Sequence, residues 1–233
     1  METPPADAPV TVDLWQWSLQ ATPERIARWH DLLSADEATR AARFLRAEHR
    51  DAFIAGRGQL REVLGAVVGQ APEALVFDYG SHGRPALRGA GMPLFNLSHS
   101  GGMAALAVCT GLQPGIDIER IRPVEPAVAL HHFSAAENAV LGTLTGQDWA
   151  RGFFRCWTRK EAMVKAIGHG LSLPLKGFDV TLAANDPPRV VRIADDDAAA
   201  WVMIGLDPAP GFEGAIALRS GGRAIRLQRR DLP

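Results

Sequence analysis

Apolar and polar positions alternate along the first ordered stretch of the chain and then change to a helical spacing. Residues 10–19 alternate closely enough to predict a strand. A threonine followed by a proline begins a predicted helix over 22–33, because proline is favoured at the first helical position. Ser34 and Glu37 have the spacing of a capping box, which predicts the start of a second helix. A third helix is expected over 50–68, where a glycine and then a proline end the pattern.

The pattern over residues 74–108 is different, because short apolar runs are separated there by clusters of glycine and proline. Such runs predict short strands joined by tight turns. Residues 115–119 form a further predicted strand, and a second capping box stands at 134–137. A long helix is expected over 148–167, and four strand-like runs follow from residue 178 onward.

Helices and strands are mixed in both halves of the chain, which predicts an α+β fold. The segment 111–115 contains two glycines and a proline and lies near the middle of the chain. We therefore expect two similar subdomains, 1–112 and 113–233. A ligand site between them is the usual arrangement for such a pair.

Length, charge and cysteine content exclude several classes of protein. A chain of 233 residues can bury a sizeable core without disulfides or a structural metal. The net charge of −1 argues against a general nucleic-acid binder and against a polybasic membrane-surface protein. The 2 cysteines make no disulfide framework and no zinc site. No stretch reaches the roughly 18 apolar residues of a membrane span, so we expect a cytoplasmic protein.

Two acidic residues stand two positions apart in the strand predicted over 115–119. Asp117 and Glu119 therefore share one face of that strand. Neighbouring carboxylates repel each other unless a cation or a proton lies between them. A solvent-facing edge strand would show the same pattern. A functional pair would instead hold a hard divalent cation, Mg²⁺ or Mn²⁺, because these ions prefer oxygen ligands.

The helix predicted over 148–167 carries a third carboxylate, with a lysine one turn later. Glu161 and Lys165 are four residues apart, in the order that favours a surface ion pair. An aromatic residue and a valine flank Glu161 on the same helix face, which suits a pocket better than open solvent. If Glu161 joined Asp117 and Glu119, the three carboxylates would hold one divalent cation. Lys165 would then lie within reach of a phosphate bound to that cation.

Small polar residues and glycines follow one of the short predicted strands. Ser98 and His99 belong to this stretch, which suits a loop whose backbone N–H groups face an anion. A plain hairpin turn with a surface histidine would have the same composition. The tripeptide Gly83-Arg84-Pro85 is, by itself, a turn that carries an arginine.

These segments are more informative in combination. In order and spacing, GRP, FNLSHSG, GIDIE and FFRCWTRKEAMVKAIGHGLSLPLKGFDV resemble the surfactin-type (Sfp-like) 4′-phosphopantetheinyl transferases. The resemblance covers residues 74–180, and its specific part is W-T-x-K-E-A-x-x-K together with G-I-D-x-E. It implies a monomer of two similar α+β halves related by a pseudo-twofold axis, with coenzyme A bound in the cleft between them.

The resemblance also implies roles for single residues. Asp117, Glu119 and Glu161 match the magnesium ligands of the family, and Lys165 matches the lysine at the diphosphate of coenzyme A. Cys156 stands where an aliphatic residue is common, and we expect it in the core. The remaining matches concern coenzyme A: Ser98 and His99 at the 3′-phosphate, Gly83, Arg84 and Pro85 beside the adenine and the phosphates, and Arg40 as an upstream basic contact to the 3′-phosphate.

The reaction implied by the resemblance moves the 4′-phosphopantetheine arm of coenzyme A to a serine of an apo acyl, peptidyl or aryl carrier protein. It releases adenosine 3′,5′-bisphosphate. A divalent cation and a lysine directed at the diphosphate suit such a transition state. Glu161 is the family's usual base, directly or through a metal-bound water.

Two other functions are alternatives, of which the first uses the same acidic residues and the second keeps only the cleft. One is a metal-dependent phosphohydrolase or nucleotidyl transferase, and the other is a non-enzymatic module that binds coenzyme A or a carrier protein. The pathway served is left open by the sequence. The length of the chain favours broad or secondary-metabolic specificity over that of the short trimeric synthases.

A carrier protein also needs a surface on which to dock. The segment 120–146 joins the two metal-binding segments and combines hydrophobic residues with arginine. We expect it to border the place where the carrier serine arrives, with Phe133 exposed there. The alternative is that these hydrophobic residues pack in the core.

Overall fold

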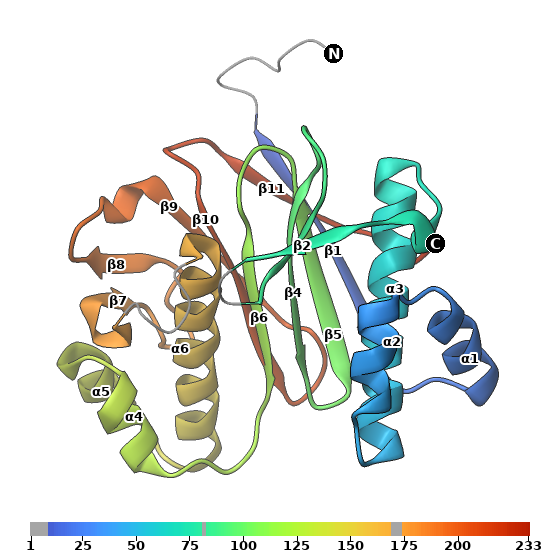
Figure 1. Ribbon diagram of the computed structural model, residues 1–233. Coiled ribbons are helices and arrows are strands. Elements are labelled where there is room, and N and C mark those ends of the chain that lie inside the picture. Colours follow the sequence, from blue (N-terminus) through green and yellow to red (C-terminus); the bar gives the residue numbers. More distant parts are fainter. Residues whose placement is uncertain (1–8, 81–82, 169–173) are drawn as a thin grey trace.

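The computed structural model describes residues 9–80, 83–168 and 174–233, and its two largest sheets lie between helices on either side (Figure 1). The first half contains β1 (Val10–Ser18), α1 (Pro23–Asp31), α2 (Ala35–Ala42), α3 (Ala47–Val68), β2 (Phe77–Tyr79), β3 (Pro85–Leu87), β4 (Leu94–Ser100) and β5 (Met103–Cys109). The second half contains β6 (Gly115–Arg120), α4 (Pro126–His132), α5 (Ala135–Leu141), α6 (Gly146–Ile167), β7 (Phe178–Val180), β8 (Val190–Ile193), β9 (Trp201–Leu206), β10 (Phe212–Arg219) and β11 (Ile225–Arg229).

Local signals determine where the helices begin and end. Both predicted capping boxes are present, because the carboxylates of Glu37 and Glu137 accept the backbone N–H groups of Ser34 and Ser134, at 3.0 and 2.9 Å. Helix α6 ends at Gly168, whose φ of +82° lies in the left-handed region that favours glycine. The predicted helix starts and stops are therefore confirmed to within a few residues.

Two sheets form the centre of the molecule. One has the strand order β11-β1-β5-β4 and the other the order β6-β10-β9. Neighbouring strands are antiparallel, except that β1 and β11 are parallel. Helix α3 lies outside the first sheet and α6 outside the second (Figure 1). The predicted α+β class is confirmed.

The facing edges of the two sheets, β4 and β6, are joined through side chains. Side chains spaced two residues apart on β4 accept hydrogen bonds from backbone N–H groups of β6. The acceptors are Asn96, Ser98 and Ser100, and their donors are Ile116, Ile118 and Arg120, at 2.9, 3.2 and 3.2 Å. The expectation of a loop around Ser98 and His99 was therefore wrong, because the period-two polar pattern belongs to a strand that pairs by its side chains. Only Gly101 and Gly102, after the strand, form the turn.

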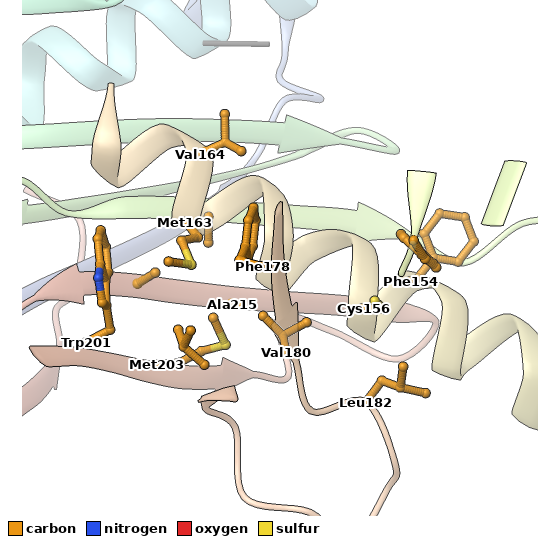
Figure 2. Close-up of a cluster of buried hydrophobic side chains, with 14 of the residues drawn as sticks. Phe154, Cys156, Met163, Val164, Phe178, Val180, Leu182, Trp201, Met203 and Ala215 are labelled. Carbon is orange, nitrogen blue, oxygen red and sulfur yellow. The ribbon is translucent and has the colours of Figure 1, made fainter. Parts of the chain in front are cut away.

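Buried side chains form three clusters, one with α3, one with α6 and one between the sheets. Figure 2 shows the second cluster, where Phe154 and Met163 of α6 meet Phe178 and Trp201. Cys156 lies in the same cluster and is fully buried, so the expectation of a core cysteine is confirmed. The third cluster connects the two halves, because it contains residues of β1 and β5 together with residues of β6 and β10.

Phe133 belongs to the core and not to the surface. Its side chain is 1% exposed, and its ring centroid lies 5.2 Å from that of Phe153 and 6.3 Å from that of Trp157. The expectation that Phe133 is exposed was therefore wrong. The chain leaves α4 at this residue and turns the ring under α6, a tertiary contact that no local pattern reveals.

The final strand joins the two halves in a way that the sequence did not predict. β11 pairs with β1, with Val10 opposite Ile225 and Leu14 opposite Arg229. The last residues of the predicted subdomain 113–233 therefore lie in the sheet of 1–112. The division into two subdomains at residue 112 stays a prediction.

Two further features bear on the chemistry of the chain. Cys109 and Cys156 are both buried and free, in agreement with the absence of a disulfide framework. Among the helices of the described residues, none has both the length and the apolar character needed to cross a bilayer.

Candidate active site

A cleft of about 1000 Å³ lies between the two halves and is lined by residues of both. Most of the residues singled out in the sequence line it: Arg40, Gly83, Arg84, Pro85, His99, Glu161 and Lys165. Ser98, Asp117 and Glu119 are not among its lining residues and lie on β4 and β6. The structure thus brings together residues that are up to 125 positions apart in the sequence, between Arg40 and Lys165.

Gly115 allows α6 to lie against β6, the strand that carries Asp117. A Cβ atom at Gly115 would stand 1.9 Å from the carbonyl oxygen of Ala162 and 2.4 Å from the backbone nitrogen of Ala166. Only glycine permits this approach. The close packing fixes the position of Lys165 relative to Asp117.

Lys165 extends from the last turn of α6 to β6. Its Nζ donates to Asp117 Oδ1 at 2.7 Å, to the carbonyl oxygen of Ile116 at 3.1 Å and to Ser98 Oγ at 3.3 Å. Its side chain is 28% exposed, so a ligand in the cleft can reach the ammonium group. The surface pair between Glu161 and Lys165, an alternative considered above, is replaced by the pair between Lys165 and Asp117.

Asp117 is almost fully buried, and only one of its two carboxylate oxygens accepts hydrogen bonds. Oδ1 accepts from Lys165 and from the hydroxyl of Ser98, the latter at 2.9 Å. Oδ2 is buried and, among the described residues, has no hydrogen-bond partner. Burial raises the pKa of this carboxyl, and the charge of Lys165 opposes the rise.

Glu119 lies on the same strand face, at its more open end. One of its carboxylate oxygens, Oε2, accepts from Ser100 Oγ at 2.6 Å and from Arg122 Nη1 at 2.8 Å. The side chain is 20% exposed. Glu119 is thus held by two donors at the rim of the same region.

Glu161 faces the cleft as a carboxylate without a counter-charge of its own. Within the described part of the chain it makes no ion pair, and it lines the cleft beside Lys165. Partial burial raises its pKa, and the charges of Asp117 and Glu119 raise it further. The charge of Lys165 opposes this rise.

A divalent cation fits the donor chemistry of these three carboxylates. The observation that supports it is the Oδ2 of Asp117, which is buried and has no hydrogen-bond partner among the described residues. The side chains are not drawn together as a finished ligand set. Among the described residues, no group of three or more histidine, cysteine, aspartate or glutamate side chains is positioned to hold a metal ion. Lys165 and Arg122 neutralise Asp117 and Glu119 in this arrangement.

Arg84 connects the two walls of the cleft. Its Nη1 donates to the carbonyl oxygen of Lys165 at 3.0 Å and so caps the end of α6. A Cβ at Gly168 would lie 3.1 Å from the same nitrogen, and Gly168 also has a positive φ. The Gly83-Arg84-Pro85 motif therefore has a structural contact in addition to its place at the cleft.

His99 and Arg40 bring further donors to the first-half wall. Restricted hydration in the cleft lowers the pKa of His99, and the nearby charge of Lys165 lowers it further. The guanidinium of Arg40 lies over the ring of Phe53, 5.2 Å from its centroid. Both residues come from the first half of the chain, whereas Glu161 and Lys165 come from α6.

Several lining residues were not found from the sequence. Phe44 and Phe53 form an aromatic pair with ring centroids 5.5 Å apart, and His49 and Tyr79 also line the cleft. The basic stretch Arg43–Arg50 contained the signal, because the apolar Phe44 and Leu45 stand among exposed charged residues there. Ser100 was missed because its partner, Glu119, is adjacent only after the two halves fold together.

Comparison with known proteins agrees with this geometry. Residues 113–217 match the model of the 4′-phosphopantetheinyl transferase superfamily. The 4′-phosphopantetheinyl transferase HetI of Nostoc sp. is 36% identical over 217 residues, which cover 91% of this chain and 89% of HetI. The 4′-phosphopantetheinyl transferase psf-1 of Bacillus pumilus is 30% identical over 88% of this chain and 87% of its own length.

A more distant relative is the 4′-phosphopantetheinyl transferase Sfp of Bacillus subtilis, which is 27% identical over 83% of this chain and 85% of its own length. The matches extend across both walls of the cleft. This chain belongs to the 4′-phosphopantetheinyl transferase family.

Proposed function

We propose that this protein transfers the 4′-phosphopantetheine arm of coenzyme A to a serine of an apo carrier protein and releases adenosine 3′,5′-bisphosphate. The observation that carries the proposal is the cleft between the halves, where Lys165, Arg84 and His99 face the same space as Glu161. Its volume of about 1000 Å³ is large enough for a nucleotide-sized ligand. Family membership supports the same reaction.

The proposed step exchanges one phosphorus–oxygen bond for another. The serine hydroxyl oxygen attacks the β-phosphorus of the coenzyme A diphosphate, and the bond from this phosphorus to the bridging oxygen breaks. Lys165 stabilises negative charge on the diphosphate oxygens by its ammonium group. Glu161 takes the serine proton, directly or through one water, since its carboxylate faces the cleft without a paired cation.

We further propose that Asp117, Glu119 and Glu161 hold Mg²⁺ or Mn²⁺. The unpartnered Oδ2 of Asp117 and the free carboxylate of Glu161 support this assignment. When bound, the cation supplies charge neutralisation at the diphosphate. The Lys165 side chain, which is partly exposed in the cleft, would reach a phosphate oxygen of the bound ligand.

The proposed subtype is that of the surfactin-type transferases, working as a monomer. Both walls of the cleft come from one chain, so no second subunit is needed to complete it. Light scattering coupled to size exclusion should give the mass of one chain. A dimer whose dissociation abolishes activity would contradict the monomer proposal.

The carrier protein is proposed to dock on the segment 120–146, now through α4 and not through Phe133. Leu130 on α4 is 65% exposed. Leu130→Ala should raise the apparent KM for the carrier about tenfold, the size expected from losing about 1.4 kcal/mol of apolar contact, and leave that for coenzyme A unchanged. Leu45, which is fully exposed on the first half, offers the matched control Leu45→Ala. Equal effects of the two variants would place docking elsewhere.

A single incubation tests the proposed activity. The purified protein is mixed with fluorescently labelled coenzyme A, an apo carrier protein and Mg²⁺, and carrier labelling is followed. Labelled carrier supports the transferase, whereas released phosphate or pyrophosphate would indicate a phosphohydrolase, and binding alone a non-enzymatic module. Excess chelator should abolish labelling and added Mg²⁺ or Mn²⁺ should restore it; full activity in chelator would overturn the metal assignment.

A further inference from the structure

The two halves repeat one order of elements. In the described residues, each half has one strand, three α-helices and four further strands, as β1, α1–α3 and β2–β5 and then as β6, α4–α6 and β7–β10. The sheet order repeats as well, since β1-β5-β4 corresponds to β6-β10-β9. Each element of the first half therefore has a counterpart in the second, with α6 as the counterpart of α3 and β9 as the counterpart of β4.

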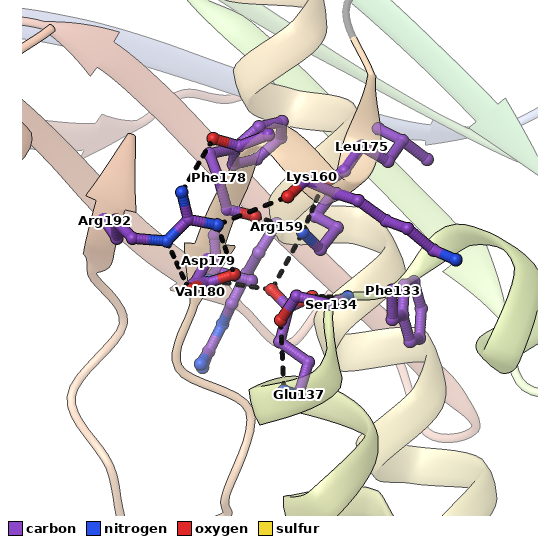
Figure 3. A network of polar contacts seen from close by, with 12 residues as sticks. Phe133, Ser134, Glu137, Arg159, Lys160, Leu175, Phe178, Asp179, Val180 and Arg192 are labelled. Carbon is purple, nitrogen blue, oxygen red and sulfur yellow. Dashed lines mark hydrogen bonds and ion pairs between the residues drawn. The ribbon is translucent and has the colours of Figure 1, made fainter. Parts of the chain in front are cut away.

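The repeat extends to buried charges. On α3, Arg61 Nε donates to Glu37 Oε2 at 2.7 Å. On α6, Lys160 Nζ lies 2.8 Å from Glu137 Oε1, in the network shown in Figure 3. Each of these basic groups also donates to backbone carbonyls of the segment that follows its helix. The same internal framework thus supports both halves.

The second half contains a counterpart of the cleft. In the first half, α3, the β2–β3 hairpin, β4 and the start of β5 line the large cleft. In the second half, α6, the segment between β7 and β8, β9 and β10 line a smaller cleft of about 480 Å³. Four elements that line the large cleft therefore have counterparts that line the smaller one, and the large cleft is also lined by α2 and, from the second half, by α6. The second hollow is formed by the second half alone.

Arg159 is the buried charge of this second cleft. It is 4% exposed, and its Nη1 donates to the carbonyl oxygen and the hydroxyl of Thr181. Its Nε is buried and has no hydrogen-bond partner among the described residues. No carboxylate of the described chain forms an ion pair with it, and Glu213 and Asp186 of the same cleft act on its charge only from beyond ion-pair distance.

The neighbouring groups leave this charge available. Arg155 is already neutralised, because its Nη2 contacts Glu213 Oε1 at 3.2 Å and its Nη1 donates to the carbonyl oxygen of Leu182 at 2.9 Å. Burial, together with the charge of Arg155, lowers the pKa of Arg159 to about 10, which still leaves it protonated at neutral pH. A guanidinium in this state is stabilised most by an oxyanion that accepts from it.

We propose that the cleft around Arg159 is a second ligand site of this protein, separate from the coenzyme A cleft, and that it binds a small oxyanion through Arg159. Phosphate and a simple carboxylate share the required chemistry. The exposed carboxylates of Asp186 and Asp207 line the same cleft and disfavour a polyphosphate such as coenzyme A. The smaller volume disfavours it too.

The Nε–H resonance of Arg159 reports directly on the site. Wild-type protein labelled with ¹⁵N is titrated with inorganic phosphate and, separately, with acetate, and the arginine Nε–H signals are followed. The Arg159 signal, identified by its loss in Arg159→Lys, should shift and saturate with at least one of the two probes. Arg219, which is exposed and paired with Asp196, serves as the reference for a general salt effect.

Two variants test separately the guanidinium of Arg159 and the free space of the smaller cleft. Arg159→Lys should weaken binding of the effective probe about tenfold, judged from backbone amide shifts, since a point charge does not replace the guanidinium donors. Gly205→Ala keeps the charge but adds a Cβ 4.0 Å from Arg159 Nη2 and 3.1 Å from Pro188 Cγ, and it should also weaken binding. If Arg159→Lys fails to fold, the Arg159 Nε–H signal is assigned instead through its bonds to the Arg159 backbone in the wild type, so the wild-type titration still decides the matter.

Three outcomes would overturn the proposal. The first is an Arg159 signal that does not shift with either probe. The second is a shift that does not saturate or that equals the shift of Arg219, which would indicate adventitious ion binding only. The third is displacement of the bound probe by coenzyme A, which would place the anion in the large cleft. None of these outcomes depends on transferase activity, so the site can fail while the proposed function stands.

Discussion

Lys165 is held at the floor of the cleft by three acceptors, and its charge has a definite role there. Lys165→Met should lower kcat by roughly 10²- to 10³-fold, because the charge that faces the diphosphate is lost. Lys165→Arg should restore only part of the rate, since the guanidinium presents a planar fork in place of a point charge. Steady-state rates with saturating coenzyme A, together with thermal melts, separate the loss of rate from a loss of folding. Unchanged turnover in Lys165→Met would show that the lysine only neutralises Asp117.

His99 allows the binding of one phosphate group to be tested by itself. We expect His99 to contact the 3′-phosphate, because it lines the cleft and offers a ring N–H donor. His99→Ala should weaken coenzyme A binding about tenfold, the usual effect of losing one hydrogen bond to a charged group, and should hardly change binding of dephospho-coenzyme A. Calorimetric titrations with both ligands provide the comparison. His30→Ala, an exposed histidine on α1 outside the cleft, is the control. Equal losses for both ligands would place His99 at another part of coenzyme A.

At the residue scale, the sequence identified chemistry better than it identified contacts. Asp117 and Glu119 were predicted to share a face, and both lie on β6 with their oxygens toward hydroxyls of β4. Ser98 was expected to bind a ligand, but its hydroxyl is used by Asp117 and by the backbone of Ile118. The spacing of side chains on a strand is a local property. The strand that lies opposite is not, so these contacts could not be predicted.

The packing of α6 on β6 sets the geometry of the site at the scale of elements. Gly115→Ala should force the helix away from the strand, because the added Cβ would stand 1.9 Å from a backbone oxygen. We expect a loss of about 1–3 kcal/mol in the free energy of unfolding. Transfer activity should fall by more than the loss of folded protein accounts for, because Lys165 and Glu161 move with the helix. Gly177→Ala is the matched control, since a Cβ there meets nothing within 4 Å. Wild-type melting and activity in Gly115→Ala would contradict this account of the motif's glycine.

The ion pairs of Glu37 on α2 with Arg57 and Arg61 on α3 should make the stability of the protein depend on pH. Burial would raise the pKa of Glu37, but the charge of Arg57 and hydrogen bonds from Arg61 and the backbone of Ser34 outweigh it and hold this pKa below its usual value. A lowered folded-state pKa stabilises the protein above the pKa of the unfolded chain, and this contribution is lost as the pH falls through the folded value. Urea unfolding between about pH 6 and pH 3 should therefore show a steeper loss of stability in wild type than in Glu37→Gln. Parallel curves would show that Glu37 does not contribute.

Element boundaries followed from local chemistry, whereas element partners did not. The capping boxes at Ser34 and Ser134, and Gly168 at the end of α6, were sufficient to place helix ends. Phe133 was assigned to the surface because the segment 120–146 joins the two predicted metal-binding segments and was expected to border the place where the carrier serine arrives. Its ring packs on Phe153, which comes from a helix that starts well after it in the chain. Hydrophobic side chains at such junctions need the fold to be assigned.

For the whole molecule, the crossing of β11 into the first sheet is the decisive connection. The sequence 225–229 alternates Ile and Leu with Arg and Gln, which is a weak strand signal in five residues, and nothing local points to β1 as its partner. The α+β class could be predicted, because helical and strand-like patterns occur in both halves of the chain. The way in which the halves are joined, through β11 and the buried cluster between the sheets, could not.

Removing this connection should divide the unfolding of the protein into two steps. Ile225 and Leu227 of β11 pack on the cluster between the sheets, where Val12 and Leu14 of β1 meet Ile116 of β6. In the wild type, we expect one calorimetric transition whose enthalpy equals the van 't Hoff value, because this cluster couples the halves. Replacing both Ile225 and Leu227 with alanine should lower stability by roughly 2–4 kcal/mol, since both side chains are only partly buried. It should also reduce the van 't Hoff enthalpy relative to the calorimetric one.

Arg226→Ala, on the same strand but directed away from the cluster, should leave both the stability and the enthalpy ratio unchanged. A single, fully cooperative transition in the double variant would show that the pairing of β4 with β6, without β11, is enough to hold the two halves together.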